Sequence, residues 1–175
     1  MKITFIGMPG AGKTCMGKAI SRKMKMSVID GDRLIEKRTG RKLQNIIDED
    51  GIEAFKKIEE ETLLSINDDN VIITPGGSAI YYDSVMNHLK KDGIIVYLYV
   101  SPEVLIERLG DFSKRGVVLE DGKTIFDLYN ERAPLLEKYA DVTVRCNGNK
   151  YVKYQNDAFK KINSLIKNRT KGGVQ

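Results

Sequence analysis

Eight residues near the start of the chain match the pattern GxxxxGK[ST] without a mismatch: Gly7-Met8-Pro9-Gly10-Ala11-Gly12-Lys13-Thr14. The match follows a short apolar run and opens a helical pattern. Glycines let backbone N–H groups turn inward around phosphate oxygens, and a helix N-terminus adds its dipole. In such a loop the lysine reaches the β- and γ-phosphates, and the hydroxyl ligates Mg²⁺. We therefore predict a nucleoside triphosphate site formed by Gly10, Ala11, Gly12, Lys13, Thr14 and Cys15.

Two carboxylates follow the next apolar run, in Asp30-Gly31-Asp32. If that run is a strand of an open α/β sheet, both emerge at its carboxyl end, where such sheets bind ligands. One carboxylate can hold the Mg²⁺ water shell while the other accepts a hydroxyl proton. A solvated turn with an aspartate helix cap explains the same residues. Both interpretations stay open on these residues alone.

Short apolar runs alternate with helical patterns along the whole chain. The expected strands are Lys2–Ile6, Ser27–Asp30, Val71–Thr74, 94–100 and Val142–Arg145. The expected helices are 13–25, 33–66 with breaks at Gly40 and Gly51, Asp83–Lys91, Pro102–Leu109, 124–140 and 156–167. Pro134 should kink or split the helix 124–140. This alternation favours one α/β domain over 1–170, in which helices cover both faces of a parallel sheet.

Two segments lack periodicity. Residues 110–122 are polar and punctuated by glycine, which predicts a mobile loop. Residues 171–175 are expected to be a frayed tail.

Composition excludes several classes of protein. The 175 residues are 41% apolar and 30% charged, a globular balance, and the two cysteines form no CxxC pair, which excludes a disulfide framework. The longest apolar run, 94–100, is too short to span a membrane, and no signal peptide is evident. We therefore expect a cytoplasmic protein that does not bind membranes.

The net charge of +5 is concentrated in two segments, 13–42 and 145–175. No nucleic-acid-binding signature accompanies these bases, so we assign the basic pole to a phosphorylated ligand rather than to nucleic acid. The GTPase motif NKxD is absent, and the chain is small for most P-loop machines. Small kinases remain, with an ATP-binding regulatory module as the alternative from another class.

The order of several spaced motifs resembles the shikimate kinases, a branch of the nucleoside-monophosphate-kinase fold. Over about residues 1–165 the matching elements are the phosphate loop, Asp30-Gly31-Asp32, Glu36-Lys37-Arg38-Thr39-Gly40, Asp50-Gly51, Phe55-Lys56-Lys57-Ile58-Glu59, Gly76-Gly77, Val96-Tyr97-Leu98, Arg115, and Glu131-Arg132-Ala133-Pro134-Leu135. The resemblance implies a five-stranded parallel sheet of order 2-3-1-4-5. It also implies a lid at about 110–122 and a substrate-binding helical region at about 31–62.

The resemblance further implies roles for individual residues. Asp32 is expected to grip the substrate hydroxyls near the attacking oxygen, and Asp30 to serve the Mg²⁺ shell. Arg115 is expected to reach the transferring phosphoryl group from the lid, and Arg108 to flank the adenine opposite the loop at 147–151. The substrate carboxylate is expected to meet Lys56, Arg132, Gly76, Gly77 and Ser78.

Three positions depart from the family pattern. Lys56 stands where the family has arginine, and a lysine offers a point charge instead of a bidentate fork. Ser78 replaces a third glycine, and we expect its side chain to strain a left-handed backbone or to enter the substrate pocket. Gly116 follows Arg115 where the family has proline, which loosens the lid.

The resemblance implies an ATP- and Mg²⁺-dependent kinase that converts shikimate to shikimate 3-phosphate and works as a monomer. Because all three departures touch the acceptor side or the lid, a kinase for another hydroxy acid, such as gluconate or a hydroxy amino acid, stays as an alternative. The retained Asp32, Arg115 and Arg132 disfavour a non-catalytic module, which needs no acceptor site. A nucleoside monophosphate kinase is also disfavoured.

Overall fold

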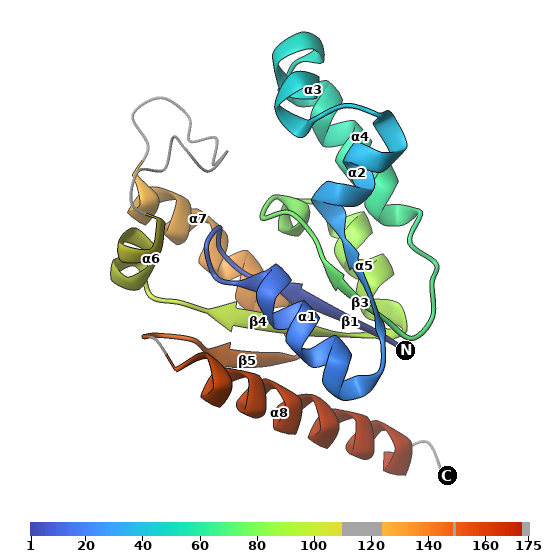
Figure 1. Ribbon diagram of the computed structural model, residues 1–175, viewed down its shortest axis with the longest axis vertical. Helices are drawn as coiled ribbons and strands as arrows, with labels where there is room; N and C mark the ends of the chain where they lie inside the picture. The colour runs from blue at the N-terminus through green and yellow to red at the C-terminus, as the bar shows by residue number, and fades with distance from the viewer. Residues whose placement is uncertain (110–123, 149, 173–175) are drawn as a thin grey trace.

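The computed structural model describes residues 1–109, 124–148 and 150–172. The described residues form a five-stranded sheet of order β2-β3-β1-β4-β5 in which all pairs are parallel, so the expected fold is confirmed (Figure 1). The strands are β1 Lys2–Ile6, β2 Ser27–Asp30, β3 Val71–Thr74, β4 Gly93–Tyr99 and β5 Val142–Arg145. The helices are α1 Lys13–Met24, α2 Gly31–Thr39, α3 Leu43–Asp50, α4 Ile52–Leu64, the 3₁₀ turn η1 Ala79–Tyr81, α5 Asp83–Lys91, α6 Pro102–Leu109, α7 Ile125–Tyr139 and α8 Tyr151–Gly172.

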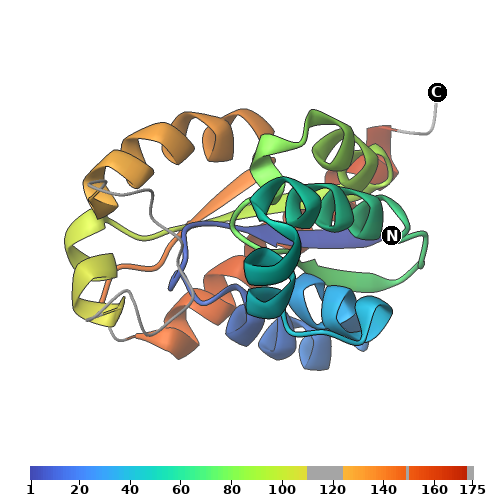
Figure 2. The same ribbon diagram turned by 90° about the horizontal axis from the view of Figure 1, so that it is seen from above.

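Helices cover both faces of the sheet. Seen from above, α1 and α8 lie on one side of the strands, and α5 and α7 on the other (Figure 2). The central strands β1 and β3 are therefore buried throughout, whereas the edge strands β2 and β5 keep partly exposed positions. This arrangement follows from right-handed crossovers between parallel strands, and it brings the carboxyl ends of all strands to one edge.

One close approach fixes α1 against the sheet. A Cβ atom on Gly17 would lie 2.6 Å from Cγ2 of Thr74 on β3, so only glycine lets the helix pack at this distance. Because α1 begins at the phosphate loop, this contact also sets the height of the loop above the sheet edge.

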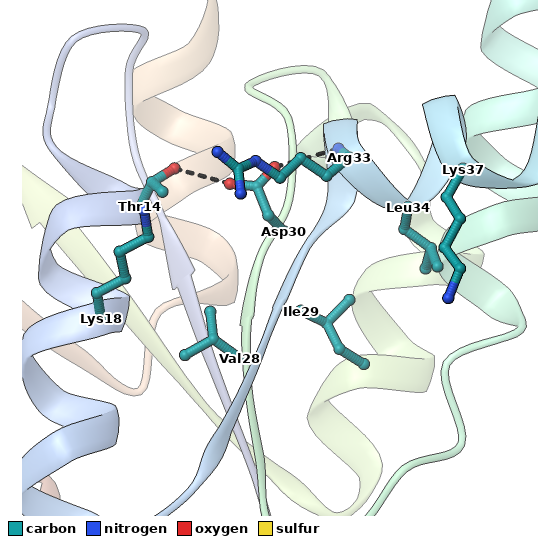
Figure 3. A pocket seen from close by; sticks show the side chains of 8 residues that line it. All are labelled: Thr14, Lys18, Val28, Ile29, Asp30, Arg33, Leu34 and Lys37. Carbon is teal, nitrogen blue, oxygen red and sulfur yellow. Dashed lines mark hydrogen bonds between the residues drawn. The ribbon is translucent and has the colours of Figure 1, made fainter. Parts of the chain in front are cut away.

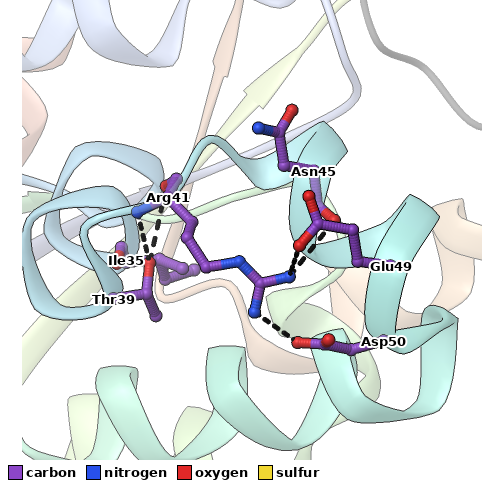
Figure 4. A network of polar contacts seen from close by, with 6 residues as sticks. All are labelled: Ile35, Thr39, Arg41, Asn45, Glu49 and Asp50. Carbon is purple, nitrogen blue, oxygen red and sulfur yellow. Dashed lines mark hydrogen bonds and ion pairs between the residues drawn. The ribbon is translucent and has the colours of Figure 1, made fainter.

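The helices α2, α3 and α4 project beyond the sheet and carry a second, small core. Ile35, Ile46 and Phe55 are buried against one another, separately from the main core. Arg41 closes this unit, because its guanidinium donates to Asp50 at 2.5 Å and to Glu49 at 2.7 Å (Figure 4). The pairs are exposed, so they add little free energy but fix how α3 sits against the end of α2.

Two helices, α7 and α8, differ from the sequence expectation. The helix α7 continues through Pro134 as one element, so the expected split does not occur. Burial of Leu128 and Leu136 on either side of the proline holds the two halves against the sheet, which offsets one missing hydrogen bond. The last helix begins at Tyr151, five residues early, because Tyr154 joins Ala158 and Ile162 in the core at helical spacing.

The expected lid at 110–122 lies outside the described residues, as does most of the expected tail. Within the described part of the chain, the helices are all too short or too polar to cross a membrane.

We expect Gly17→Ala to lower the free energy of unfolding by about 1–3 kcal/mol, because the added methyl group overpacks the contact with Thr74. Urea unfolding followed by circular dichroism measures the change. Lys18→Ala, an exposed substitution in the same helix, is the matched control and should change stability by less than about 0.5 kcal/mol. Equal stability of Gly17→Ala and the wild type would contradict this packing.

Candidate functional site

The phosphate loop connects β1 to α1 at the carboxyl edge of the sheet. Gly10 and Gly12 have positive φ angles of 77° and 93°, and a Cβ atom on Gly10 would lie 2.8 Å from the Leu109 side chain. Both positions therefore require glycine. Gly12 is the N-cap of α1, and no side chain among the described residues caps this helix. The first N–H groups of α1, including those of Lys13, Thr14 and Cys15, are thus available to an anion.

Lys13 folds back over its own loop. Its Nζ donates to the carbonyl oxygens of Gly7 at 3.1 Å and Met8 at 3.3 Å. Burial lowers the pKa of Lys13 to about 8, and the positive charge of Arg132 lowers it further, while the Asp32 and Asp30 carboxylates oppose the shift. A phosphate group entering the loop would replace these weak carbonyl contacts with a full counter-charge.

Asp30 ties three elements together at the end of β2. Its Oδ2 accepts a hydrogen bond from Thr14 Oγ1 at 3.0 Å (Figure 3). The same oxygen accepts from Thr74 Oγ1 at 3.5 Å. Its Oδ1 accepts from the Arg33 N–H, which caps α2. The capping role left open by the sequence is therefore real, and it coexists with the placement of Asp30 beside the phosphate loop.

Thr14 and Asp30 together fit a magnesium ion. The Thr14 hydroxyl and the Asp30 carboxylate are neighbouring oxygen donors, and Mg²⁺ binds through a few oxygens while keeping waters and phosphate ligands. No cluster of three or more His, Cys, Asp or Glu side chains suited to a metal occurs in the described residues. Two oxygen donors suit an ion that takes its remaining ligands from phosphate and water.

Asp32 faces a glycine-rich turn after β3. A Cβ atom on Gly76 would lie 3.1 Å from Asp32 Oδ1, so the carboxylate rests against the backbone of this turn. Desolvation by the surrounding protein raises the pKa of Asp32, and repulsion by Asp30 raises it further, against the attraction of Lys13. Asp32 is therefore a stronger proton acceptor than an ordinary surface aspartate.

The backbone at Ser78 is not strained, contrary to the expectation from the sequence. Its φ and ψ angles are −82° and −17°, in the right-handed helical region, so a side chain is accommodated and the expected left-handed conformation is wrong. Its hydroxyl donates to the Glu59 carboxylate, 2.8 Å from Oε1 and 2.7 Å from Oε2. The serine side chain is thus directed to a partner on α4.

Glu59 is a site residue that we did not single out from the sequence. It is 1% exposed, and Tyr82 donates to its Oε2 at 2.9 Å in addition to Ser78. Burial raises the pKa of Glu59, and these two donors partly oppose the shift. The available signal was a glutamate four residues after the buried Phe55, hence on the apolar face of the helix.

Arg132 reaches the same turn from α7. A Cβ atom on Gly77 would lie 2.8 Å from Arg132 Nη1, so the guanidinium lies against this glycine. The turn is thus bordered by Asp32 on one side and Arg132 on the other. Lys56, the other expected clamp residue, is exposed and forms an ion pair with Glu53 at 2.7 Å on α4.

The remaining expected residues include Arg108 and Cys15, which the sequence assigns to the nucleotide. Arg108 Nη2 donates to the carbonyl oxygens of Cys146 and Gly148, and the guanidinium lies 5.8 Å from the centre of the Tyr151 ring. Arg108 thus lies directly against the segment that we expected on the opposite side of the adenine. Cys15 is exposed beside the loop. Arg115 and Gly116 lie outside the described residues.

Comparisons with known proteins point to one family. The family model described as shikimate kinase matches residues 9–166. The chain is 42% identical over 116 residues to a shikimate kinase of Bacillus anthracis (strain CDC 684 / NRRL 3495), covering 66% of this chain and 70% of the relative. It is 36% identical over 150 residues to one of Francisella tularensis subsp. novicida (strain U112), covering 83% and 85%. The structure of the Acinetobacter baumannii shikimate kinase in complex with shikimate superposes with a TM-score of 0.82 at 26% identity, covering 99% of this chain and 95% of that one.

The lowered pKa of Lys13 predicts a pH dependence of nucleotide binding. Below pH 8 the ammonium is already charged, whereas above it binding must take up a proton. We expect ATP affinity to fall by up to about tenfold per pH unit above pH 8, with proton uptake measured by calorimetry in buffers of different ionisation enthalpy. In Lys13→Arg, whose side chain stays charged, affinity should be level from pH 7.5 to 9.5. Equal profiles for both proteins would contradict the assignment.

The contact of Ser78 with Glu59 predicts a pH-dependent stability. Ser78→Ala removes a donor to a buried carboxylate and should cost about 2 kcal/mol, or roughly 4–8 °C in Tm, at pH 8. The loss should shrink as pH falls through the raised pKa of Glu59, because the protonated carboxyl needs the donor less. Thermal unfolding at pH 8 and pH 5 measures this.

The matched control for this experiment is Ser84→Ala. Ser84 also donates to a glutamate of α4, Glu60, but the pair is exposed. Its loss should therefore be small at both pH values. A pH-independent loss in Ser78→Ala, equal to that of the control, would show that the serine does not stabilise an ionised Glu59.

Proposed function

This chain belongs to the shikimate kinase family, and it transfers a phosphoryl group from ATP to shikimate. On that premise, we propose a role for each residue of the candidate site. One observation carries the assignment of roles. Asp32 and Arg132 border a single glycine turn, Gly76-Gly77, beside an intact phosphate loop. A hydroxyl acceptor that also bears a carboxylate needs this combination of a carboxylate and a guanidinium.

The nucleotide side consists of the phosphate loop and Arg108. The backbone N–H groups of Gly10, Ala11, Gly12, Lys13, Thr14 and Cys15 surround the phosphates, and Lys13 adds its charge to the β- and γ-phosphates. Support comes from the uncapped start of α1 and from the positive φ angles of Gly10 and Gly12. Arg108 lies against the adenine, with the 147–151 segment opposite.

Thr14 and Asp30 would hold Mg²⁺, directly or through water. The ion would supply positive charge that offsets the negative charge of the phosphates. The hydrogen bond between these side chains supports the assignment, because it keeps two oxygen donors together at the mouth of the loop.

The acceptor side consists of Asp32, Arg132, Lys56 and the turn Gly76-Gly77-Ser78. Asp32 orients the attacking hydroxyl and takes its proton, and its raised pKa suits that step. Arg132 binds the acceptor carboxylate through its planar fork, with the Gly77 backbone alongside. Lys56 must leave Glu53 to reach the same carboxylate, so it contributes a longer-range charge until the substrate binds.

The other features follow the same proposal. Arg115 brings positive charge from the lid at 110–122 to the transferring group, and the lid excludes water. The helices of the 31–62 region form the acceptor-binding unit on their separate core. The enzyme acts as a monomer in the cytoplasm, where the free thiols of Cys15 and Cys146 are stable.

ADP release with ATP and Mg²⁺ tests the function. We expect shikimate to stimulate release, because the chain belongs to the shikimate kinase family. Gluconate and hydroxy amino acids, which also carry a hydroxyl and a carboxylate, are the comparison acceptors and should not stimulate it. Asp32→Asn keeps the shape but removes the proton acceptor, so kcat should fall by about 10²–10⁴-fold. Lys13→Ala should abolish activity and exclude a contaminant. Stimulation by another hydroxy acid alone would reassign the acceptor, and nucleotide binding without any stimulation would favour a regulatory module.

A further inference from the structure

Tyr81 lies between the acceptor turn and the arginine that borders it. It ends the 3₁₀ turn η1, only three residues after Ser78, and its side chain is partly exposed. Arg132 Nε donates to the Tyr81 hydroxyl at 3.0 Å, and the guanidinium carbon lies 5.2 Å from the centre of the tyrosine ring. Arg132 is therefore held by a hydrogen bond and by a cation–π contact with the same residue.

The hydrogen bond uses the one guanidinium nitrogen that end-on carboxylate binding does not need. A guanidinium can present its two terminal nitrogens, Nη1 and Nη2, as a parallel fork to a carboxylate. Because Nε is bound to Tyr81, the two terminal nitrogens face the turn Gly76-Gly77. Nη1 lies 2.8 Å from where a Cβ atom on Gly77 would be. The tyrosine thus fixes the rotation of the guanidinium.

Glu131 fixes the direction of the tyrosine hydroxyl. The Tyr81 O–H donates to Glu131 Oε1, so its oxygen lone pairs are free to accept from Arg132. Burial raises the pKa of Tyr81, and the Glu131 carboxylate raises it further, which keeps the hydroxyl protonated. The two hydrogen bonds therefore run in one direction: Arg132 donates to Tyr81, and Tyr81 donates to Glu131.

We propose that Tyr81 is a positioning residue that sets the orientation of Arg132 for the acceptor carboxylate and so determines acceptor affinity. The inference rests on the proposed role of Arg132 at the acceptor site. A long arginine side chain loses rotamer entropy when it is ordered, and an arginine ordered before binding spares the substrate that cost. Loss of the Tyr81 hydroxyl should therefore weaken binding of the acceptor without changing the other steps of the reaction.

Steady-state kinetics of Tyr81→Phe with the full-length enzyme tests the proposal. The substitution keeps the ring and the cation–π contact but removes the hydroxyl. We expect KM for shikimate to rise by about 5- to 30-fold, as for one lost charge-assisted hydrogen bond, while kcat and KM for ATP stay within about twofold. An unchanged KM for shikimate would overturn the proposal, and so would an equal rise in both KM values.

A second tyrosine provides the matched control. Tyr139, which lies on α7 as Arg132 does, donates to the Asp83 carboxylate and accepts from Lys138, whose ammonium lies 4.7 Å from the ring centre. Tyr139→Phe removes a hydroxyl from a similar carboxylate–tyrosine–cation arrangement that is not at the acceptor turn. KM for shikimate should stay within about twofold of the wild type. A rise equal to that of Tyr81→Phe would mark a general loss of structure and overturn the specific role.

A double-mutant cycle separates positioning from folding and from the proposed function. Lysine has no Nε, so in an Arg132→Lys background Tyr81→Phe should raise KM for shikimate by less than about twofold. Persistence of the full effect in that background would overturn the proposal. If Arg132→Lys alone leaves KM for shikimate unchanged, the proposed clamp fails. If that variant raises KM while Tyr81→Phe does not, the clamp stands and only the role of Tyr81 is refuted.

Discussion

The lack of room beside Gly76 and Gly77 is the constraint on which the proposed acceptor site depends. A Cβ atom on Gly76 would lie 2.7 Å from Glu59 Oε1, and one on Gly77 would lie 2.8 Å from Arg132 Nη1. Real Cβ atoms do not approach other atoms this closely, so carboxylates and a guanidinium can approach the turn only because it has no side chains there. The strand β3 therefore ends in a bare backbone around which charged groups from α2, α4 and α7 collect.

Charge balance is the second condition that the site must satisfy. Neighbouring charges, among them those of Asp32, Arg132 and Asp30, act on the pKa values of three buried side chains at the site, Lys13, Asp32 and Glu59. Desolvation is the largest cause of the pKa shift for Lys13, Asp32 and Glu59, so burial disfavours the charged form of each. A phosphate beside Lys13 and an acceptor carboxylate beside Arg132 would add negative charge next to these two cations, so the site is complementary to the ligands that we propose.

Hydroxyl groups form hydrogen bonds with the charged side chains of the site without adding charge of their own. Ser78 and Tyr82 donate to Glu59, Thr14 donates to Asp30, and Tyr81 links Glu131 to Arg132. A neutral donor satisfies a buried carboxylate but leaves nearby cations for the substrate. Ser78 thus satisfies the buried Glu59 carboxylate at the proposed site, although the family has a glycine at this position.

The sequence by itself determined the sheet, its order through the family resemblance, and the phosphate loop with Lys13 and Thr14. These features depend on local patterns: apolar runs of strand length, helical spacing, and glycines at fixed distances from a lysine. Which groups on separate elements meet becomes clear only once the chain is folded. Glu59 and Ser78 are 19 residues apart, and Tyr81 and Arg132 are 51 residues apart, so no local pattern links them. Their contacts arise because the glycine turn has no side chains and because α4 and α7 pack beside it, which is a consequence of packing rather than of local sequence.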